Sequence, residues 1–336
     1  MKGETIFRKT IRGSALLGNS IGFTGTGDAL AQRADMGELV IESDVQGKPH
    51  KGKVFAVIHA HLDDVTDYAS GTVAKLINEG YTGYLIRTSN NEKTGGSTNA
   101  QNILSSEQDQ IRMAKKLGFT DVFDFYYQQH RMNGVSPIEI RGRLVLIFRG
   151  LKVDTVITHN PWGHGEENPD HWVTGRAVEE ACWMAGGSND FPEQIDAGYL
   201  PHSVKERYYW VGRLGQSFNR VIDVSSYLEQ KINAIVECKS QGGGNWGSQL
   251  RKQLEKEGKR LPILGTDDKT ADREYVRFLI EHSMLSHSDD WRGDAWGFDG
   301  VEQYGLKYAE RFYYIDQRPK GKSRVEEYIQ KNAVSL

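Results

Sequence analysis

The sequence predicts an α/β fold of the Rossmann-like type, in which a mainly parallel sheet is flanked by helices. Two observations indicate this fold. Short apolar stretches that suit buried strands alternate along the chain with stretches whose apolar residues recur at helical spacing. Such alternation is typical of parallel strands joined by right-handed helical crossovers. The predicted strands cover residues 54–58, 83–88, 121–127 and 154–158, and the predicted helices between them cover 65–78, 104–117 and 138–150.

Further elements precede and follow this core. Within the helix at 104–117, the spacing predicts that Leu104, Ile111, Ala114 and Leu117 face inward. The other predicted elements are an edge strand at 37–43, strands at 208–211 and 220–223, and helices at 171–184, 227–241 and 250–259.

Length and composition favour one large soluble domain. The chain has 336 residues, 38% of them hydrophobic and 26% charged, and we expect residues 32–336 to form a single domain with C-terminal loop and helix extensions. A net charge of −3 offers no basic surface for nucleic acid. No apolar run approaches the roughly 18 residues that indicate a membrane-spanning helix. Cys182 and Cys238 have apolar neighbours in helical patterns, which predicts buried free thiols.

The first 31 residues differ from the rest of the chain. Basic residues outnumber acidic ones, a weakly apolar stretch follows, and Ala29-Leu30-Ala31 fits a signal-peptide cleavage site. The pair Arg8-Lys9 resembles a degenerate twin-arginine export signal. We therefore expect residues 1–31 to be cleaved, or unpacked if retained, and the mature chain to be periplasmic or extracellular. The alternative is a disordered leader on a cytoplasmic protein.

Polar residues follow the apolar strand that starts at Val54. This strand runs into His59-Ala60-His61-Leu62-Asp63-Asp64, after which the helical pattern begins. The carboxyl edge of a parallel sheet is where ligand sites form, and imidazole with carboxylate suits a borderline metal such as zinc. Asp63 and Asp64 have a simpler alternative role, as the cap of the helix and its neighbour.

A second strand ends in the same kind of cluster. The strand at 154–158 leads into His159, His164 and then Asn168-Pro169-Asp170-His171, where another helix opens. Two strand ends rich in His and Asp, each opening a helix, are able to converge on one metal ion.

These two motifs resemble those of the LmbE/PIG-L-like N-acetylglucosaminyl de-N-acetylases, a family of zinc-dependent amidases. Ala60-His61-Leu62-Asp63-Asp64 is similar to the family's A-H-P-D-D, with leucine in place of proline, and residues 168–171 are similar to its H-P-D-H. The resemblance spans roughly residues 50 to 315. Later segments that also resemble the family are Asp223-Val224-Ser225, Ser240-Gln241 and Ala309-Glu310-Arg311-Phe312.

The resemblance implies a role for each motif residue. His61, Asp64 and His171 would bind Zn²⁺, or another divalent metal, and Asp63 would be the general base that takes a proton from water. Asn168 stands where the family has a histidine that donates a proton or supports the oxyanion. Asparagine can only offer N–H hydrogen bonds.

Three alternatives follow from that departure. Asn168 supports the oxyanion while His164 or His159 donates the proton, or Asp63 carries the proton alone, or the chain binds without catalysing. With Asp170 from the second motif, the expected catalytic residues are Asp63, Asn168, Asp170 and His164.

The chain also departs from the family at a substrate-binding arginine. Leu104 occupies that position, and Arg87 or Arg131 is a candidate replacement, although a plain surface role is the alternative for each. His59 precedes the first motif on its strand and is expected to be a satisfied core histidine. The acidic stretch 289–297, with two Trp residues, suits either a sugar ring or an ordinary surface turn.

Two classes of function remain open. The first is a zinc-dependent hydrolase that removes an N-acyl group from an amino sugar or glycoconjugate by activating water. The second is a non-catalytic sugar- or metal-binding module that retains the fold. The intact His61, Asp63, Asp64 and His171 favour the hydrolase.

Overall fold

The computed structural model describes residues 9–10, 39–213, 216–282, 305–317 and 323–335. The stretch 289–297 lies outside these ranges, and so does the leader except for Lys9–Thr10. These two residues form a short strand that pairs antiparallel with residues 40–41. Cleavage and export stay predictions.

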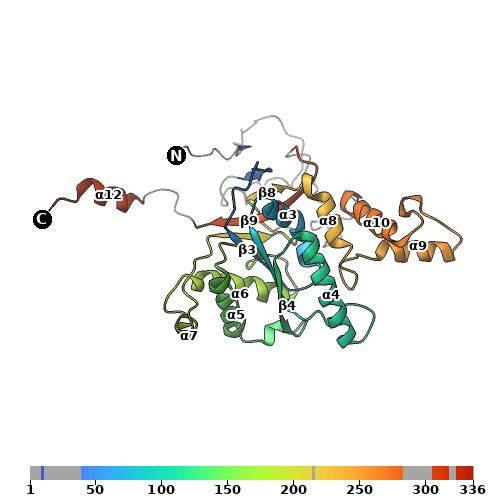
Figure 1. Ribbon diagram of the computed structural model, residues 1–336, viewed down its shortest axis with the longest axis horizontal. Helices are drawn as coiled ribbons and strands as arrows, with labels where there is room; N and C mark the ends of the chain where they lie inside the picture. Colours follow the sequence, from blue (N-terminus) through green and yellow to red (C-terminus); the bar gives the residue numbers. More distant parts are fainter. Residues whose placement is uncertain (1–8, 11–38, 214–215, 283–304, 318–322, 336) are drawn as a thin grey trace, which may run out of the picture.

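One sheet of nine strands forms the centre of the described structure, in the order β1-β2-β8-β9-β7-β6-β3-β4-β5 (Figure 1). Most neighbouring pairs are parallel, which confirms the predicted fold class. Antiparallel pairing occurs where β9 lies between β7 and β8, and between β1 and β2. The strands are β1 Lys9–Thr10, β2 Val40–Glu42, β3 Val54–His59, β4 Thr82–Ser89, β5 Asp121–Tyr127, β6 Thr155–His159, β7 Glu206–Trp210, β8 Arg220–Asp223 and β9 Ala309–Asp316.

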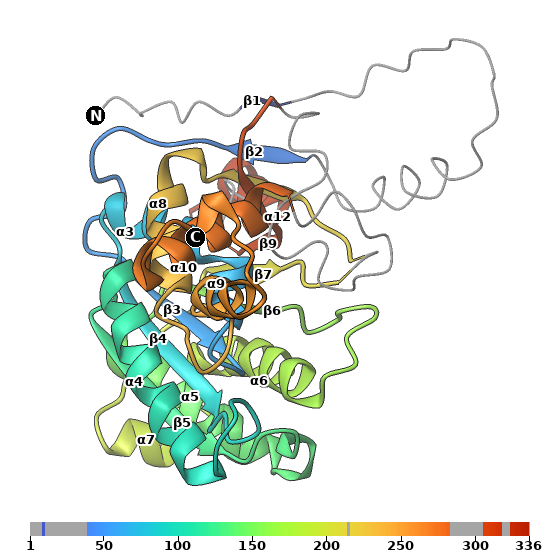
Figure 2. The same ribbon diagram turned by 90° about the vertical axis from the view of Figure 1, so that its right-hand side faces the viewer.

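Helices cover both faces of this sheet (Figures 1 and 2). Helices α3, α4 and α8 pack on one face, and α5 and α6 pack on the other. The helices are α2 Asp64–Tyr68, α3 Ser70–Asn78, α4 Asn99–Leu117, α5 Pro137–Leu151, α6 Pro169–Ala185, α7 Pro192–Asp196, α8 Leu228–Ile235, α9 Trp246–Lys256, α10 Asp268–His282 and α12 Arg324–Asn332. None of them is both long and apolar enough to cross a membrane.

The apolar run of β3 is explained by burial on both sides. Phe55 and Val57 belong to the core on the α3 and α8 face, whereas Ala56 and Ile58 belong to the core on the α5 and α6 face. A central parallel strand covered on both faces needs apolar residues at every position. Both cysteines are buried free thiols, as predicted.

The order of the strands creates a switch point beside β3. From β3 the chain continues to β4 and β5 on one side, and then crosses to β6 on the other side of β3. In open α/β sheets, ligands bind where the direction of strand addition reverses, outside the carboxyl ends of the strands. One predicted motif follows the carboxyl end of β3, and the other follows the carboxyl end of β6. The two motifs meet because β3 and β6 are neighbours in the sheet.

The predicted inward face of α4 is partly wrong. Ala114 and Leu117 are buried, but Leu104 and Ile111 are 58% and 60% exposed. The buried face of α4 instead carries polar residues, among them Ser106 and Asp109, because this face packs against polar groups of other elements. Ser106 accepts a hydrogen bond from the buried Arg87, at 3.1 Å.

The predicted helix at 227–241 is also shorter than expected, since α8 ends at Ile235. Beyond it, the backbone N–H and the hydroxyl of Ser240 donate to Oδ2 of Asp109 on α4, at 2.6 and 2.8 Å. A side chain of another helix thus replaces the carbonyl partner that a continued helix would supply. This contact directs residues 239–242 toward the carboxyl edge of the sheet.

Candidate active site

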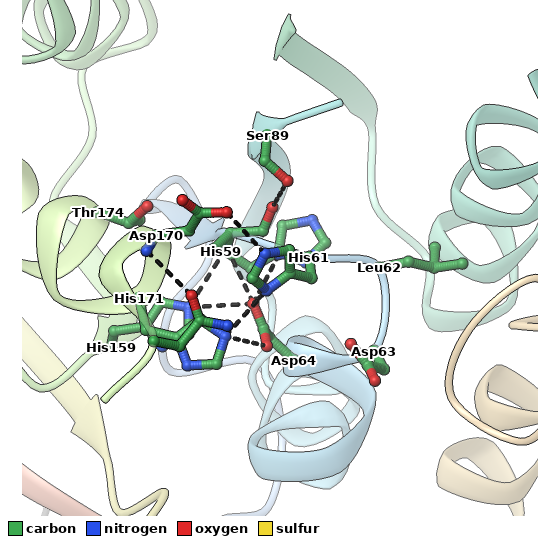
Figure 3. A network of polar contacts seen from close by, with 12 residues as sticks. His59, His61, Leu62, Asp63, Asp64, Ser89, His159, Asp170, His171 and Thr174 are labelled. Carbon is green, nitrogen blue, oxygen red and sulfur yellow. Dashed lines mark hydrogen bonds and ion pairs between the residues drawn. The ribbon is translucent and has the colours of Figure 1, made fainter. Parts of the chain in front are cut away.

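Three residues of the two motifs meet at the switch point (Figure 3). His61 lies in the turn between β3 and α2, Asp64 is the first residue of α2, and His171 lies in the first turn of α6. Nδ1 of His61 is 2.9 Å from Nε2 of His171, and that Nε2 is 3.3 Å from Oδ1 of Asp64. One potential ligand atom from each residue lies within 4.8 Å of the other two.

Local backbone contacts fix the Asp64 carboxylate. Its Oδ2 accepts the backbone N–H groups of Ala60 and His61, at 2.9 and 2.7 Å, and lies 3.0 Å from Nε2 of His159. These contacts anchor Oδ2 and leave Oδ1 facing His171. His159 is buried, and its ring stacks on His171 with centroids 4.3 Å apart.

The pKa values of Asp64, His171 and His159 in this cluster are shifted in different directions. Burial disfavours a charge on Asp64, yet the neighbouring His171 and His159 hold the pKa of its carboxyl well below the usual range. Burial also opposes protonation of His171, but Asp64 and Glu166 outweigh it and raise the pKa of His171 to about 10. For His159, burial and the nearby His171 lower the pKa to about 4, so it is neutral at pH 7.

A series of polar contacts orients the His171 ring through its Nδ1 atom. Nδ1 of His171 lies 3.1 Å from Oε2 of Glu166, and the other oxygen of Glu166 accepts a hydrogen bond from Arg213, at 2.8 Å. Arg213 also donates to the hydroxyl of Tyr68, at 3.2 Å. Glu166 thereby orients the His171 ring with Nε2 toward His61 and Asp64.

Asp170 supports His61 in the same way. It is fully buried, and its Oδ2 lies 3.0 Å from Nε2 of His61. Its carboxylate also accepts hydrogen bonds from the backbone N–H groups of His130 and Met132, at 2.7 and 3.3 Å. Burial raises the pKa of its carboxyl, but these hydrogen bonds lower it further than burial raises it. Asp170 does not line the cavity described below, and its contacts place it where it orients the ring of His61.

A cavity of about 440 Å³ opens beside the cluster, within the usual size range of small-ligand sites. His61, Asp64 and His171 all line it. Its remaining lining residues are Asp63, Asp67, Tyr68, Thr94, Gln129, His130, Glu167, Asn168, Pro169, Arg213 and Gln241.

Asp63 lines this cavity without belonging to the cluster of His61, Asp64 and His171, and in Figure 3 its side chain lies apart from them. It occupies the N-cap position of α2 but makes no capping hydrogen bond, so the simpler role considered above does not hold for it. Gly242 packs against it with φ of +94°, and a Cβ there would lie 2.9 Å from that of Asp63. This close approach requires glycine.

Asn168 lies at the cavity and caps α6. Its Oδ1 accepts the backbone N–H of Asp170 at 3.0 Å, which leaves the amide N–H₂ as the donor that the side chain can offer a ligand. A catalytic role for Asn168 stays a prediction.

Four other candidates lie away from the cavity. His164 does not line the cavity, and its carbonyl accepts a hydrogen bond from Gln216, at 3.1 Å. Arg87 is fully buried against Asp124, and neither it nor Arg131 lines the cavity. His59 is buried, as expected, but neither ring nitrogen has a hydrogen-bond partner among the described residues.

The donor atoms fit a divalent metal of zinc type. Two imidazole nitrogens and a carboxylate oxygen converge, and two ligands of one ion at about 2.0–2.2 Å must lie within about 4 Å of each other, as the His61 and His171 nitrogens do. His159, Glu166 and His171 form an overlapping set of potential ligands. Neither His159 nor Glu166 lines the cavity, so only the first set would present a metal to a substrate.

Comparison with known families agrees with this geometry. The family model described as PIG-L: GlcNAc-PI de-N-acetylase matches residues 56–182, a segment that contains both motifs. This segment of the chain is therefore similar to a PIG-L (LmbE-like) domain.

Solved structures share the fold of this chain at low identity. The N,N′-diacetylchitobiose deacetylase from Pyrococcus horikoshii is 18% identical, with a TM-score of 0.58 over 82% of this chain and 89% of that one. The 4-carboxy-2-hydroxymuconate hydratase from Pseudomonas putida is 17% identical, with a TM-score of 0.52 over 81% and 99%. A conserved protein from Thermus thermophilus is also 17% identical, with a TM-score of 0.52 over 80% and 96%.

Two residues of the candidate site, Glu166 and Arg213, are not among those that the sequence predicts, whereas the sequence places His130 at the active edge of the sheet without assigning it a role. Glu166 lies between the second strand exit and the Asn168 motif, and its spacing of five from His171 carried no signal. His130 follows β5 and Arg213 follows β7, so both lie after parallel strands whose carboxyl ends face the same edge. Applying the strand-exit argument to β7 as well would have found Arg213.

Proposed function

We propose that this chain is a metal-dependent hydrolase that removes an acyl group, such as acetyl, from the nitrogen of an amino sugar or related amine. One observation carries the proposal. His61, Asp64 and His171 bring ligand atoms within 4.8 Å of one another at a cavity that Asp63 also lines. The similarity to a PIG-L domain, in a segment that contains all four residues, supports the reaction class.

His61, Asp64 and His171 would hold the metal, with Zn²⁺ favoured by the nitrogen and carboxylate donors. When bound, such an ion lowers the pKa of water and polarises a carbonyl group. Glu166 and Asp170 each hold one of the histidine rings in place from the side away from the cluster.

Asp63 is the general base in this proposal. Its carboxylate lies at the cavity and is not used as a helix cap, so it is able to accept a proton from the attacking water. The water oxygen then bonds to the acyl carbon, and the C–N bond of the amide breaks. The products are a carboxylic acid and an amine, which must gain a proton as it leaves.

Two residues of the cavity serve this second half of the reaction. The amide N–H₂ of Asn168 offers a hydrogen bond to the developing oxyanion, the role that such donors have in acyl transfer. His130 lines the cavity, whereas His164 does not, so His130 is the proton donor to the amine in this proposal. Asp63 returning its own proton is the alternative route.

The polar lining of the cavity suits a saccharide. Thr94, Gln129, Gln241 and Arg213 supply hydroxyl, amide and guanidinium groups that are able to bind sugar hydroxyls. In this proposal Arg213 binds substrate in place of the family's arginine, a role for which Arg87 and Arg131 are the candidates from the sequence.

The second candidate function is a sugar- or metal-binding module without catalysis. Asn168 favours it, because this residue cannot donate a proton in the way that a protonated histidine does, and its oxygen already serves as a helix cap. The intact Asp63 and the cavity histidine His130 argue for the enzyme.

One experiment separates the two functions. The purified chain is analysed for bound metal and incubated with N-acetyl sugars, and released amine and acetate are quantified, with Asp63→Asn and chelator-treated protein as controls. We expect equal amounts of amine and acetate from the untreated chain only. Metal-loaded protein that releases neither product from any sugar would establish the binding module. Because a hydratase shares this fold, amine release is the readout that decides the reaction class.

A further inference from the structure

A second cavity, of about 500 Å³, lies next to the site and has no role in the reaction proposed above. Its walls come from the loop between β4 and α4, from one side of α4, and from the stretch between α8 and α9. Its lining residues are Gly95, Gly96, Ser97, Asn102, Ser105, Gln108, Asp109, Arg112, Lys239, Ser240, Asn245, Trp246 and Gln249.

A hydrogen-bonded ridge separates the two cavities. Thr94 and Gln241 line the first cavity, and their chain neighbours Gly95 and Ser240 line the second. The side-chain nitrogen of Asn91 donates to both Thr94 and Gln241, at 2.6 Å each. A ligand that leaves the first cavity over this ridge therefore enters the second one.

The α4 wall of the second cavity is polar. Ser105, Gln108 and Arg112 are spaced three and four residues apart, so they lie on one side of the helix. The side chains of Ser105, Gln108 and Gln249 make no hydrogen bond within the described part of the chain, so their donors and acceptors are available to a ligand.

Trp246 contributes an aromatic surface to this polar cavity, with 39% of the residue exposed. Gly243 packs against its ring with φ of +80°, and a Cβ there would lie 2.9 Å from two ring carbons. The backbone thus supports Trp246 at a distance that only glycine allows.

The loop that carries Trp246 is held in place without a ligand. Ser240 binds Asp109 of α4 through both its backbone N–H and its hydroxyl, and the carboxylate of Asp109 is buried. On the other side, the backbone N–H of Ser248 donates to Asp272 of α10, at 2.7 Å. Such a preformed site loses little conformational freedom when it binds a ligand.

We infer that the second cavity is a subsite for a second saccharide ring of the substrate. A sugar ring presents a flat C–H face, which suits the ring of Trp246, and a rim of hydroxyls, which suits Ser105, Gln108 and Gln249. The inference rests on the proposed function and narrows the substrate to N-acetylated di- or oligosaccharides and their conjugates. Trp246 and Gln249 lie outside the segment that the family model matches, whereas Ser105 and Gln108 lie inside it, so the C-terminal part of the chain supplies one wall of this subsite.

The test measures binding and turnover separately. Calorimetry gives the affinities of metal-loaded protein for N-acetylglucosamine and for N,N′-diacetylchitobiose, and acetate release gives kcat/KM for both. We expect wild type to favour the disaccharide about tenfold, the scale of one good aromatic contact. In Trp246→Ala and in the cavity-filling Ser105→Trp, both ratios should fall to about one. Trp183→Ala, which removes a 74% exposed tryptophan of α6, is the matched control and should keep the preference.

Each outcome decides between the two proposals. Disaccharide preference in binding without acetate release would support the subsite and refute the proposed hydrolase. Acetate release with equal preference for both sugars would support the hydrolase and refute the subsite. A preference that persists in both Trp246→Ala and Ser105→Trp would also overturn the subsite, and so would a failure of N,N′-diacetylchitobiose to bind.

Discussion

Oδ2 of Asp170 lies 3.0 Å from Nε2 of His61, while Nδ1 of the same ring faces His171 at 2.9 Å. Asp170 and His171 are consecutive residues in the first turn of α6. One helical turn therefore supplies both a candidate metal ligand and the carboxylate that orients another. This arrangement explains why an aspartate precedes the histidine in the second motif. The role of Asp170 is to orient the ring of His61.

Replacing Asp170 should weaken metal binding more than it changes the chemistry. We expect Asp170→Asn to reduce zinc affinity about 10- to 100-fold, the usual effect of removing a carboxylate that orients a metal-bound histidine. Competition with a chelator measures the affinity directly. Asp121→Asn on the exposed start of β5 is the control and should bind zinc like wild type. Unchanged affinity in Asp170→Asn would refute the positioning role.

Asp63 and Asp64 should respond in opposite ways to the same substitution. Asp63→Asn should keep its metal and lose about 10²- to 10⁴-fold in turnover, because it removes a proton acceptor. Asp64→Asn should lose metal, because it changes a charged ligand to a neutral one. Metal content and acetate release of both variants, measured on the same preparations, check this. A metal-free Asp63→Asn protein would mean that the two roles are exchanged.

Asn168 and His130 should contribute to different parts of the second half of the reaction. Asn168→Ala should lower kcat about 10²- to 10³-fold, the scale of one lost oxyanion donor. His130→Ala should be impaired most with poor leaving amines and much less with an activated anilide, whose amine leaves without help. Equal losses of His130→Ala on both substrates would exclude it as the proton donor and leave Asp63 as the carrier.

Glu79 should make the stability of the fold depend on pH. It ends α3, where it accepts Nζ of Lys75 at 2.6 Å and the backbone N–H of Val45 at 3.2 Å, and lies 3.4 Å from Nε2 of His50. Burial raises the pKa of its carboxyl, but these partners lower it below the ordinary value of 4.5. A depressed pKa gives stability that is present above the unfolded-state pKa and is lost as pH falls through the folded-state pKa.

We therefore expect Glu79→Gln to lower the free energy of unfolding by about 3 kcal/mol at pH 7, as for one partner of a buried ion pair. The difference from wild type should begin to shrink as pH falls below the ordinary value of 4.5, where the unfolded-state carboxyl takes up a proton, and should disappear as pH falls through the lower folded-state pKa. Denaturant titrations at pH 7 and pH 3.5 measure it. The control is Glu255→Gln, whose side chain is 55% exposed and pairs with Arg251. This variant should lower the free energy of unfolding by less than about 1 kcal/mol. An equal loss at both pH values for Glu79→Gln would refute the linkage.

The sequence by itself determined the fold class and the core of the candidate site. Alternating apolar strands and helices allowed a parallel sheet, and the two His- and Asp-rich strand exits indicated where ligand atoms would converge. These features are local, because strand periodicity and motif spacing can be read within about ten residues. His61, Asp64 and His171 accordingly lie together as the motifs predicted.

Tertiary structure alone decided which other side chains join them. The inward face of α4 is set by Arg87 and Ser240, which the helix meets across the fold and which its own periodicity does not reveal. Arg213 reaches the cavity because β7 lies next to β6 in the sheet. The cavity beneath Trp246 forms only where residues 239–249 pack against α4. Such contacts join residues far apart along the chain, and only the packing of the whole chain brings them together.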